Sequence, residues 1–70
     1  MAKIILEPNE TFEHFHSEAS STILLSGTAH YRMEDIEQDL KPNVPVLTPP
    51  MKSHILTNTG IDECILGCSH

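Results

Sequence analysis

Three histidines are the side chains in this 70-residue sequence best suited to bind a metal ion. His14 and His16 form an H-x-H pair, and His54 follows in the second half of the chain. In an extended strand, residues i and i+2 point to the same face, so His14 and His16 can direct two imidazoles at one point. Imidazole binds zinc, iron, copper and nickel, so a third histidine from a distant strand would complete a metal site. His30 and His70 lack such neighbours, and we expect both to be solvated surface residues.

The residues around the histidine pair resemble the first motif of the cupin superfamily, which reads G-x5-H-x-H-x3,4-E-x6-G. His14 and His16 match the motif histidines, and Gly27 matches its closing glycine. Pro8 stands where the family has its first glycine.

The residues around His54 resemble the second cupin motif, which reads G-x5-P-x-G-x2-H-x3-N. Pro49, His54 and Asn58 match it, whereas Asn43 and Met51 stand where the family has glycine. The resemblance covers roughly residues 6 to 67. It is specific for the fold and says little about the reaction, because one fold hosts many reactions.

The glutamate ligand of the first cupin motif has no counterpart in this chain. Counting seven residues back from the closing glycine puts Ser20 at its position, and a hydroxyl is a poor ligand beside a carboxylate. The resemblance therefore implies a metal site of His14, His16 and His54, with open positions for water or substrate. Glu18 shares strand parity with the histidine pair, so it is either an additional ligand or a solvated turn residue.

The rest of the sequence divides into short segments typical of β-strands, separated by turn residues. The predicted strands cover residues 3–6, 11–16, 21–25, 28–33, 36–40, 44–48, 53–58 and 61–66. Pro45 assigns the sixth of these to a sheet edge, because proline has no N–H to donate. The pattern predicts an all-β fold. The resemblance implies a single cupin domain over residues 1–70, a small β-barrel or jelly-roll-like sandwich known as the double-stranded β-helix.

Strand alternation predicts which side chains line the cavity beside the histidines. The predicted inward residues are Phe12, Ser20, Thr22, Leu24, Leu56 and Asn58. A cavity that is partly apolar and partly lined by hydroxyls suits a small-molecule ligand. The apolar residues predicted on other faces are Ile4, Ile5, Ile23, Leu25 and Ile55. Their exposure would leave a surface for a partner subunit, and the resemblance implies a homodimer.

Composition and charge narrow the partners and the location. The formal net charge of −6 argues against binding to nucleic acid or anionic membranes. Residues 1–7 are too short for a signal peptide and no apolar run approaches a membrane span, so we expect a cytoplasmic protein. Cys64 and Cys68 are predicted to be reduced, because a strand separates such Cα atoms by roughly 13 Å and a disulfide needs less than about 7 Å.

Three functions remain open from the sequence. The leading hypothesis is a metal-binding mini-cupin with one divalent ion, Fe(II) first and Zn(II), Ni(II) or Mn(II) as alternatives, acting as a dioxygenase-like oxidoreductase on a small molecule. The second is an isomerase, epimerase or lyase for a small acid or sugar derivative, with Glu18 or His30 as its base. The third is a non-catalytic module that binds a small ligand or serves as a structural unit. The motifs assign no catalytic residue, and Arg32 is the only arginine in the chain.

Overall fold

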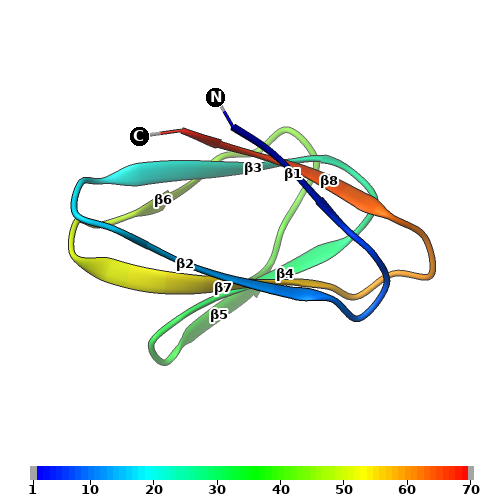
Figure 1. Ribbon diagram of the computed structural model, residues 1–70, viewed down its shortest axis with the longest axis horizontal. Helices are drawn as coiled ribbons and strands as arrows, with labels where there is room; N and C mark the ends of the chain where they lie inside the picture. The colour runs from blue at the N-terminus through cyan, green and yellow to red at the C-terminus, as the bar shows by residue number, and fades with distance from the viewer. Residues whose placement is uncertain (1, 70) are drawn as a thin grey trace.

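The computed structural model describes residues 2–69, so the prediction for His70 lies outside the described residues. In this range the chain forms eight β-strands and no helix (Figure 1). The strands are β1 (Ala2–Leu6), β2 (Thr11–His16), β3 (Ser20–Ser26), β4 (Ala29–Met33), β5 (Ile36–Asp39), β6 (Val46–Thr48), β7 (Lys52–Asn58) and β8 (Cys64–Ser69). They confirm the predicted all-β fold. Within residues 2–69, no helix is long and apolar enough to cross a membrane.

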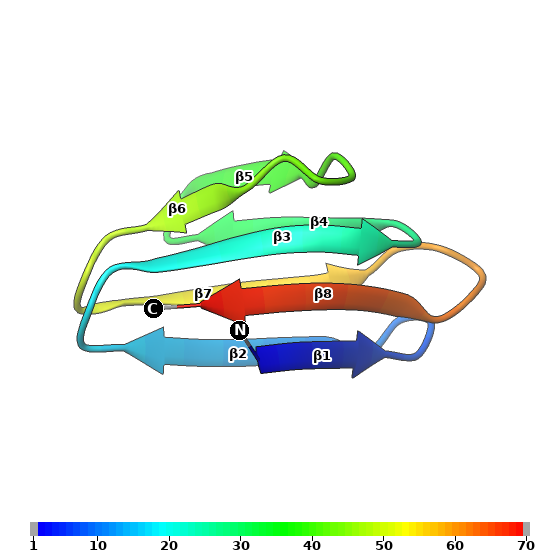
Figure 2. The ribbon, with the colours of Figure 1, turned by 90° about the horizontal axis from the view of Figure 1, so that it is seen from above.

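The strands form two four-stranded antiparallel sheets that lie face to face (Figure 1, Figure 2). Sheet A has the strand order β1-β8-β3-β6, and sheet B has the order β2-β7-β4-β5. Every connection except the β4–β5 hairpin crosses from one sheet to the other. No strand ladder joins the two sheets among the described residues. Of the two predicted forms, the chain therefore adopts the jelly-roll-like sandwich, and its sheets do not close into a barrel.

The core lies between the sheets and follows strand alternation. On β3, the buried residues Ser20, Thr22 and Leu24 alternate with partly exposed ones. The same period puts Leu56 of β7 and Leu66 of β8 at full burial. Burying each of these leucines stabilises the fold by about 2 kcal/mol. The core cluster comprises Leu6, Leu24, Ala29, Tyr31, Leu40, Leu56, Cys64 and Leu66.

β8 spans Cys64–Ser69 and therefore starts three residues later than the predicted segment 61–66. The side chain of Asn58 accounts for the delay. Its Nδ2 donates to the carbonyl of Asp62 at 2.8 Å, and its Oδ1 accepts from the N–H of Gly60 at 2.8 Å. These bonds hold the segment after β7 in a turn. The strand also ends later than predicted, at Ser69, so it includes Cys68, which faces the core.

β6 is shorter than the predicted segment 44–48. The N–H of Val44 donates to the carbonyl of Lys41 at 3.2 Å in the preceding turn. Pro45 has no N–H for a ladder, so pairing begins at Val46. The strand lies at the edge of sheet A, as the proline predicted.

Two turns keep a glycine-like backbone without glycine. Asn43 and Met51, at the two glycine positions of the second cupin motif, have φ angles of 64° and 65°. A residue with a Cβ pays roughly 1–2 kcal/mol in this left-handed region. Gly27 has φ of 86°, and a Cβ there would lie 2.8 Å from the Cβ of Cys64. Position 27 therefore requires glycine, whereas the fold tolerates the strain at Met51.

Candidate metal centre

β2 and β7 bring the three predicted histidines together on the inner side of sheet B. The strands pair with His14 directly opposite His54, and His16 lies two residues further along β2. The ring centroids are 3.9 Å apart for His14 and His16, 6.0 Å for His14 and His54, and 6.1 Å for His16 and His54. The cluster lies toward the end of the sandwich where the β2–β3 and β6–β7 connections run, at the left of Figure 1.

His54 is the most buried of the three histidines. Its side chain is 0% exposed, and neither Nδ1 nor Nε2 has a hydrogen-bond partner among the described residues. Nδ1 of His14 is also buried without a partner in this range. Burial, followed by the charges of His14 and His16, lowers the pKa of His54 below its ordinary value of 6.5. The interior therefore favours neutral His54, which is the form that coordinates a metal ion.

Sheet A places a thiol against these histidines. Cys68 of β8 is 3% exposed and lies opposite Thr22 of β3 in the strand register. Its Sγ is 3.8 Å from Nε2 of His16. One ligand atom each from His14, His54 and Cys68 lie within 4.8 Å of one another. The close group thus contains two imidazoles and one thiol, and the third imidazole, His16, lies beside it without belonging to it.

Ser20, at the glutamate position of the family motif, is buried between the sheets. It is 2% exposed, its Oγ has no hydrogen-bond partner among the described residues, and it lies opposite Thr48 of β6. Glu18 is exposed in the bend between β2 and β3 and does not belong to the group of close ligand atoms. Glu18 therefore adds no ligand atom to that group.

Aromatic rings flank the histidine cluster on both sides. Phe12 is partly buried, and its ring contacts that of His14 edge-on with centroids 5.2 Å apart. The Tyr31 ring stacks on His54 at 5.7 Å and 20°. The Tyr31 hydroxyl shares a 2.5 Å hydrogen bond with Oγ1 of Thr48, which joins sheet B to sheet A beside the centre. Tyr31 was not identified from the sequence.

The other predicted cavity residues lie on inner faces at varying distance from the histidines. Thr22, Leu24 and Leu56 are all buried. Asn58 is fully buried at the far end of β7 from His54. Its Nδ2 donates to a β1 carbonyl at 2.9 Å as well as to the β7–β8 turn. The amide of Asn58 therefore serves the fold and does not reach the metal centre.

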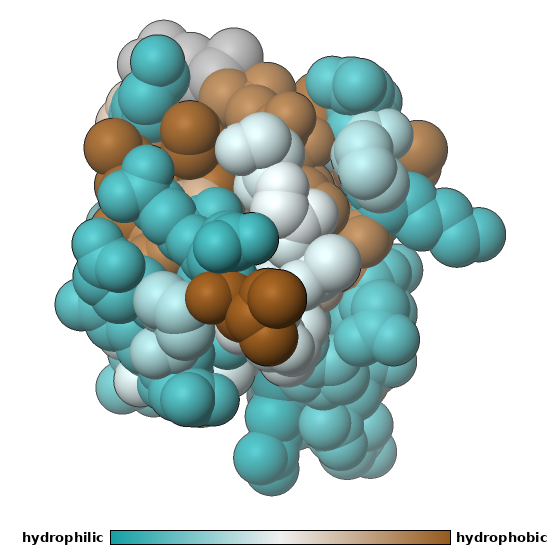
Figure 3. Space-filling view, turned by 90° about the vertical axis from the view of Figure 1, so that its right-hand side faces the viewer, coloured by the Kyte–Doolittle hydropathy of each residue, from teal (hydrophilic) through white to brown (hydrophobic). Residues whose placement is uncertain are grey.

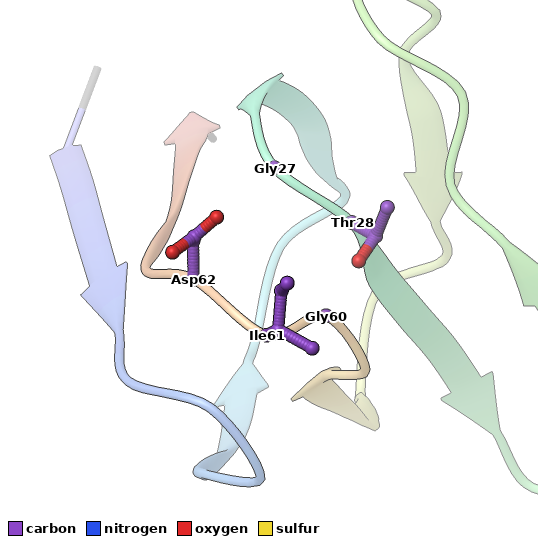
Figure 4. A pocket seen from close by; sticks show the side chains of 5 residues that line it. All are labelled: Gly27, Thr28, Gly60, Ile61 and Asp62. Carbon is purple, nitrogen blue, oxygen red and sulfur yellow. The ribbon is translucent and has the colours of Figure 1, made fainter.

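A pocket of about 420 Å³ lies at the opposite end of the sandwich (Figure 4). The β3–β4 and β7–β8 connections form it, and Gly27, Thr28, Gly60, Ile61 and Asp62 line it. Figure 3 looks at this end of the molecule. Apolar side chains gather in its upper half, on the side of sheet A, and the lower half is mostly hydrophilic. With no histidine or cysteine in its lining, the pocket is separate from the metal centre.

The donor atoms of His14, His54 and Cys68 fit a metal ion after small side-chain movements, whereas His16 lies outside this close group. A tetrahedral ion with bonds of about 2.0–2.3 Å holds its nitrogen and sulfur ligands about 3.3–3.8 Å apart. The donors of His14, His54 and Cys68 already lie within 4.8 Å. The observed and ideal separations of the donor atoms differ by at most about 1.5 Å. Side-chain rotations can close this difference. Imidazole and thiolate both bind first-row transition metals.

Cys68 is the member of this centre that the sequence analysis missed. Its spacing from Cys64 matches no common zinc pair, and β8 was predicted to end at Leu66. The usable signal was the alternation of Cys64, Leu66 and Cys68, which continues one inner face past the predicted end. Both cysteines are free thiols, as predicted. Burial raises the pKa of the Cys64 thiol.

No protein-family model and no curated protein matches the sequence. Solved structures match it in shape. The Cupin_2 domain of an XRE family transcriptional regulator from Enterobacter cloacae aligns with a TM-score of 0.83 and 20% identity, over 94% of this chain and 73% of that one. A cupin superfamily protein from Desulfitobacterium hafniense aligns with a TM-score of 0.79 and 19% identity, over 96% of this chain and 62% of that one.

A third match is a predicted oxalate decarboxylase from Thermotoga maritima, with a TM-score of 0.82 and 20% identity. The alignment covers 94% of this chain and 59% of that one. The chain thus spans less than two thirds of the second and third of these proteins. Identities near 20% establish the architecture and no activity. With the strand order and the two histidine motifs, these matches show that the chain has the cupin fold.

Proposed function

We propose that this protein binds one divalent metal ion through His14, His16 and His54 and holds a small-molecule ligand beside it. The burial of His54 carries the proposal. Both of its ring nitrogens lack a hydrogen-bond partner among the described residues. The ring centroids of His14 and His16 lie 6.0 and 6.1 Å from that of His54. A buried polar group without a partner costs about 1–3 kcal/mol. A metal ion would bind one of these nitrogens and turn three crowded bases into a stabilising cluster.

The neutral ligands favour an anionic small molecule. Three imidazoles leave the charge of the ion undiminished. The only arginine, Arg32, is exposed, and its Nε donates to the carbonyl of Glu34 at 3.2 Å. An anionic group would therefore be held by the ion itself. Fe(II) would supply dioxygen-dependent oxidation at such a site, so a dioxygenase-like reaction is the first activity to test.

An isomerase, epimerase or lyase would need a base close to the ion. His30 instead pairs with Asp39 and Glu37 on the β4–β5 hairpin, both at 3.0 Å. The hydrogen bond to Asp39 and then that to Glu37 raise the pKa of His30. Glu18 is exposed in the β2–β3 bend. Since neither candidate base lies among the three histidines, the geometry favours the metal-binding proposal over this alternative.

A homodimer through the outer face of sheet A is a second part of the proposal. Ile5, Leu25 and Leu47, on β1, β3 and β6, are 52%, 38% and 76% exposed. Ile4, which was predicted to lie on an outer face, packs against the core instead. A 70-residue chain has a small core and gains stability when a second copy covers such residues. Light scattering should give twice the 7.8 kDa chain mass, and a folded monomer at micromolar concentration would contradict the dimer.

A cytoplasmic location is the third part. Cys64 and Cys68 are both free thiols, and the reducing cytosol keeps thiols in that state. The net charge of −6 disfavours binding to nucleic acid or an anionic membrane.

Elemental analysis of protein purified without a nickel column tests the metal proposal. We expect one metal ion per chain, and metal-free protein should take up one equivalent when titrated with Fe(II), Zn(II), Ni(II) or Mn(II). Oxygen consumption in the presence of small thiols and acids then tests the dioxygenase-like activity. A protein that takes up none of the four ions contradicts the proposal.

A further inference from the structure

We propose that Cys68 is a fourth ligand, so that the centre is a closed set of three imidazoles and one thiolate that prefers zinc. This inference rests on the proposed metal site and names its ion. It also assigns the anionic ligand that the family motif supplies from the position of Ser20. Here that ligand would come from β8, the strand next to β3 in sheet A.

The position of the thiol supports coordination. Sγ of Cys68 lies within 4.8 Å of ligand atoms of both His14 and His54, and 3.8 Å from Nε2 of His16. The thiol is therefore in reach of an ion held by His14 and His54, and His16, which lies outside that close group, would turn toward the ion. A free cysteine elsewhere in an apolar core would have no such group of nitrogens around it.

Among the described residues, the thiol has two hydrogen-bond contacts. Oγ1 of Thr22 is 4.0 Å and Nε2 of His16 is 3.8 Å from Sγ, and hydrogen bonds of a thiol are weak. The side chain is 3% exposed, so bulk water contributes little. His54, which is 0% exposed and has no partner for either ring nitrogen among the described residues, points independently to a ligand in this space.

The donor set decides the ion. A thiolate with three imidazoles suits zinc, whose protein sites are tetrahedral with nitrogen and sulfur ligands. On binding, the S–H bond of Cys68 breaks, the proton leaves to solvent, and the sulfur lone pair forms the bond to the ion. Four protein ligands leave no open position, which is the arrangement of a structural zinc site. Binding of the proposed anionic ligand or of dioxygen at the ion would then require Cys68 to leave it.

The ligands also come from both layers of the sandwich. His14, His16 and His54 belong to sheet B, and Cys68 belongs to sheet A. An ion bound to all four would join the sheets directly, in addition to side-chain packing and the Tyr31–Thr48 and Asn58–Leu6 hydrogen bonds. For a small core, such a link is a strong source of stability, because metal binding to the folded state is folding free energy.

Cobalt(II) spectroscopy tests this inference without reference to any activity. The chain contains two cysteines, so in a Cys64→Ser variant Cys68 is the only thiol. We expect Co(II) bound to this variant and to the parent to show the intense thiolate-to-cobalt charge-transfer absorption in the near ultraviolet. A Cys68→Ser variant should lose this absorption. It should also bind zinc more weakly by at least the roughly 10- to 100-fold that outer-shell changes cause.

The outcomes separate the inference from the proposed function. Co(II) uptake by the Cys64→Ser variant without the charge-transfer band would overturn the role of Cys68 and leave an open three-histidine site. Unchanged zinc affinity in folded Cys68→Ser would do the same. No uptake of cobalt or zinc by the parent would overturn this inference, and no uptake of Fe(II), Ni(II) and Mn(II) as well would overturn the proposed function. Because the spectrum of Cys64→Ser decides alone, the test does not depend on Cys68→Ser folding.

Discussion

His14 of β2 lies directly opposite His54 of β7 in the antiparallel register, with ring centroids 6.0 Å apart. Paired residues on one face of a sheet interact strongly, and like charges directly opposite destabilise the pair. His54 is fully buried and His14 is partly buried. The buried His54 is therefore compatible with the fold when its imidazole is neutral, and neutral imidazoles are metal ligands.

This relationship predicts that acid destabilises the metal-free protein. The folded-state pKa of His54 is lowered below its ordinary 6.5, first by burial and then by His14 and His16. The stability from its neutral form is complete above the unfolded pKa and is lost as pH falls through 6.5 toward the folded pKa. The free energy of unfolding should fall by at most about 1.4 kcal/mol per pH unit for this one proton. Urea denaturation between about pH 7 and pH 5 measures the slope.

A His54→Leu variant and a His30→Ala variant serve as comparisons. His54→Leu removes the group and should flatten the slope below 6.5. The pKa of His30 is raised by Asp39 and then Glu37, so its contribution is present below 6.5 and is lost as pH rises above it. His30→Ala should therefore leave the acid slope in place. An unchanged slope in His54→Leu would show that another group is responsible.

Ser20→Glu should tighten metal binding, because a carboxylate adds a charge and a donor at a buried inward position. We expect roughly a tenfold lower Kd for a divalent ion, about 1.4 kcal/mol. Ser21→Glu is the matched control, because Ser21 is the next residue on β3 and points to the opposite face. Isothermal titration of both variants measures the difference. Equal Kd values would mean that position 20 does not face the ion.

Met51→Gly should stabilise the fold. Met51 has φ of 65°, is 65% exposed, and donates its N–H to the carbonyl of His16 at 3.0 Å. Glycine removes the left-handed strain of about 1–2 kcal/mol but loses more entropy on folding, about 0.5–1 kcal/mol. The free energy of unfolding should therefore rise by up to about 1.5 kcal/mol. A β-branched residue suits positive φ poorly, so Met51→Val should lower it. A stability order with valine above glycine would refute this account of the turn.

Local patterns were sufficient to predict most of the fold. Alternating side chains and turn residues located eight strands, because a residue's inner or outer face depends on its own strand. The delayed start of β8 was not predictable in this way. It results from hydrogen bonds between the Asn58 amide and the turn around Gly60 and Asp62. These bonds leave no periodic pattern in the sequence from which they could be predicted.

The histidines were predictable for the same reason, and Cys68 was not. His14 and His16 share one strand, so their spacing alone places them on one face. The approach of Cys68 to them depends on the register of β8 with β3 and on the stacking of two sheets. Both are long-range relationships between segments far apart in the chain, and Cys68 lies beyond the predicted end of its strand.

The most direct test of the metal site is the melting temperature with and without a chelator, compared between the parent, His54→Ala and His30→Ala. An ion that binds only the folded state raises its stability by mass action. We predict that the chelator lowers the melting temperature of the parent and of His30→Ala and has no effect on His54→Ala, which should also purify without metal. If His54→Ala keeps both its metal and its response to the chelator, His54 does not hold the ion and the central claim is wrong.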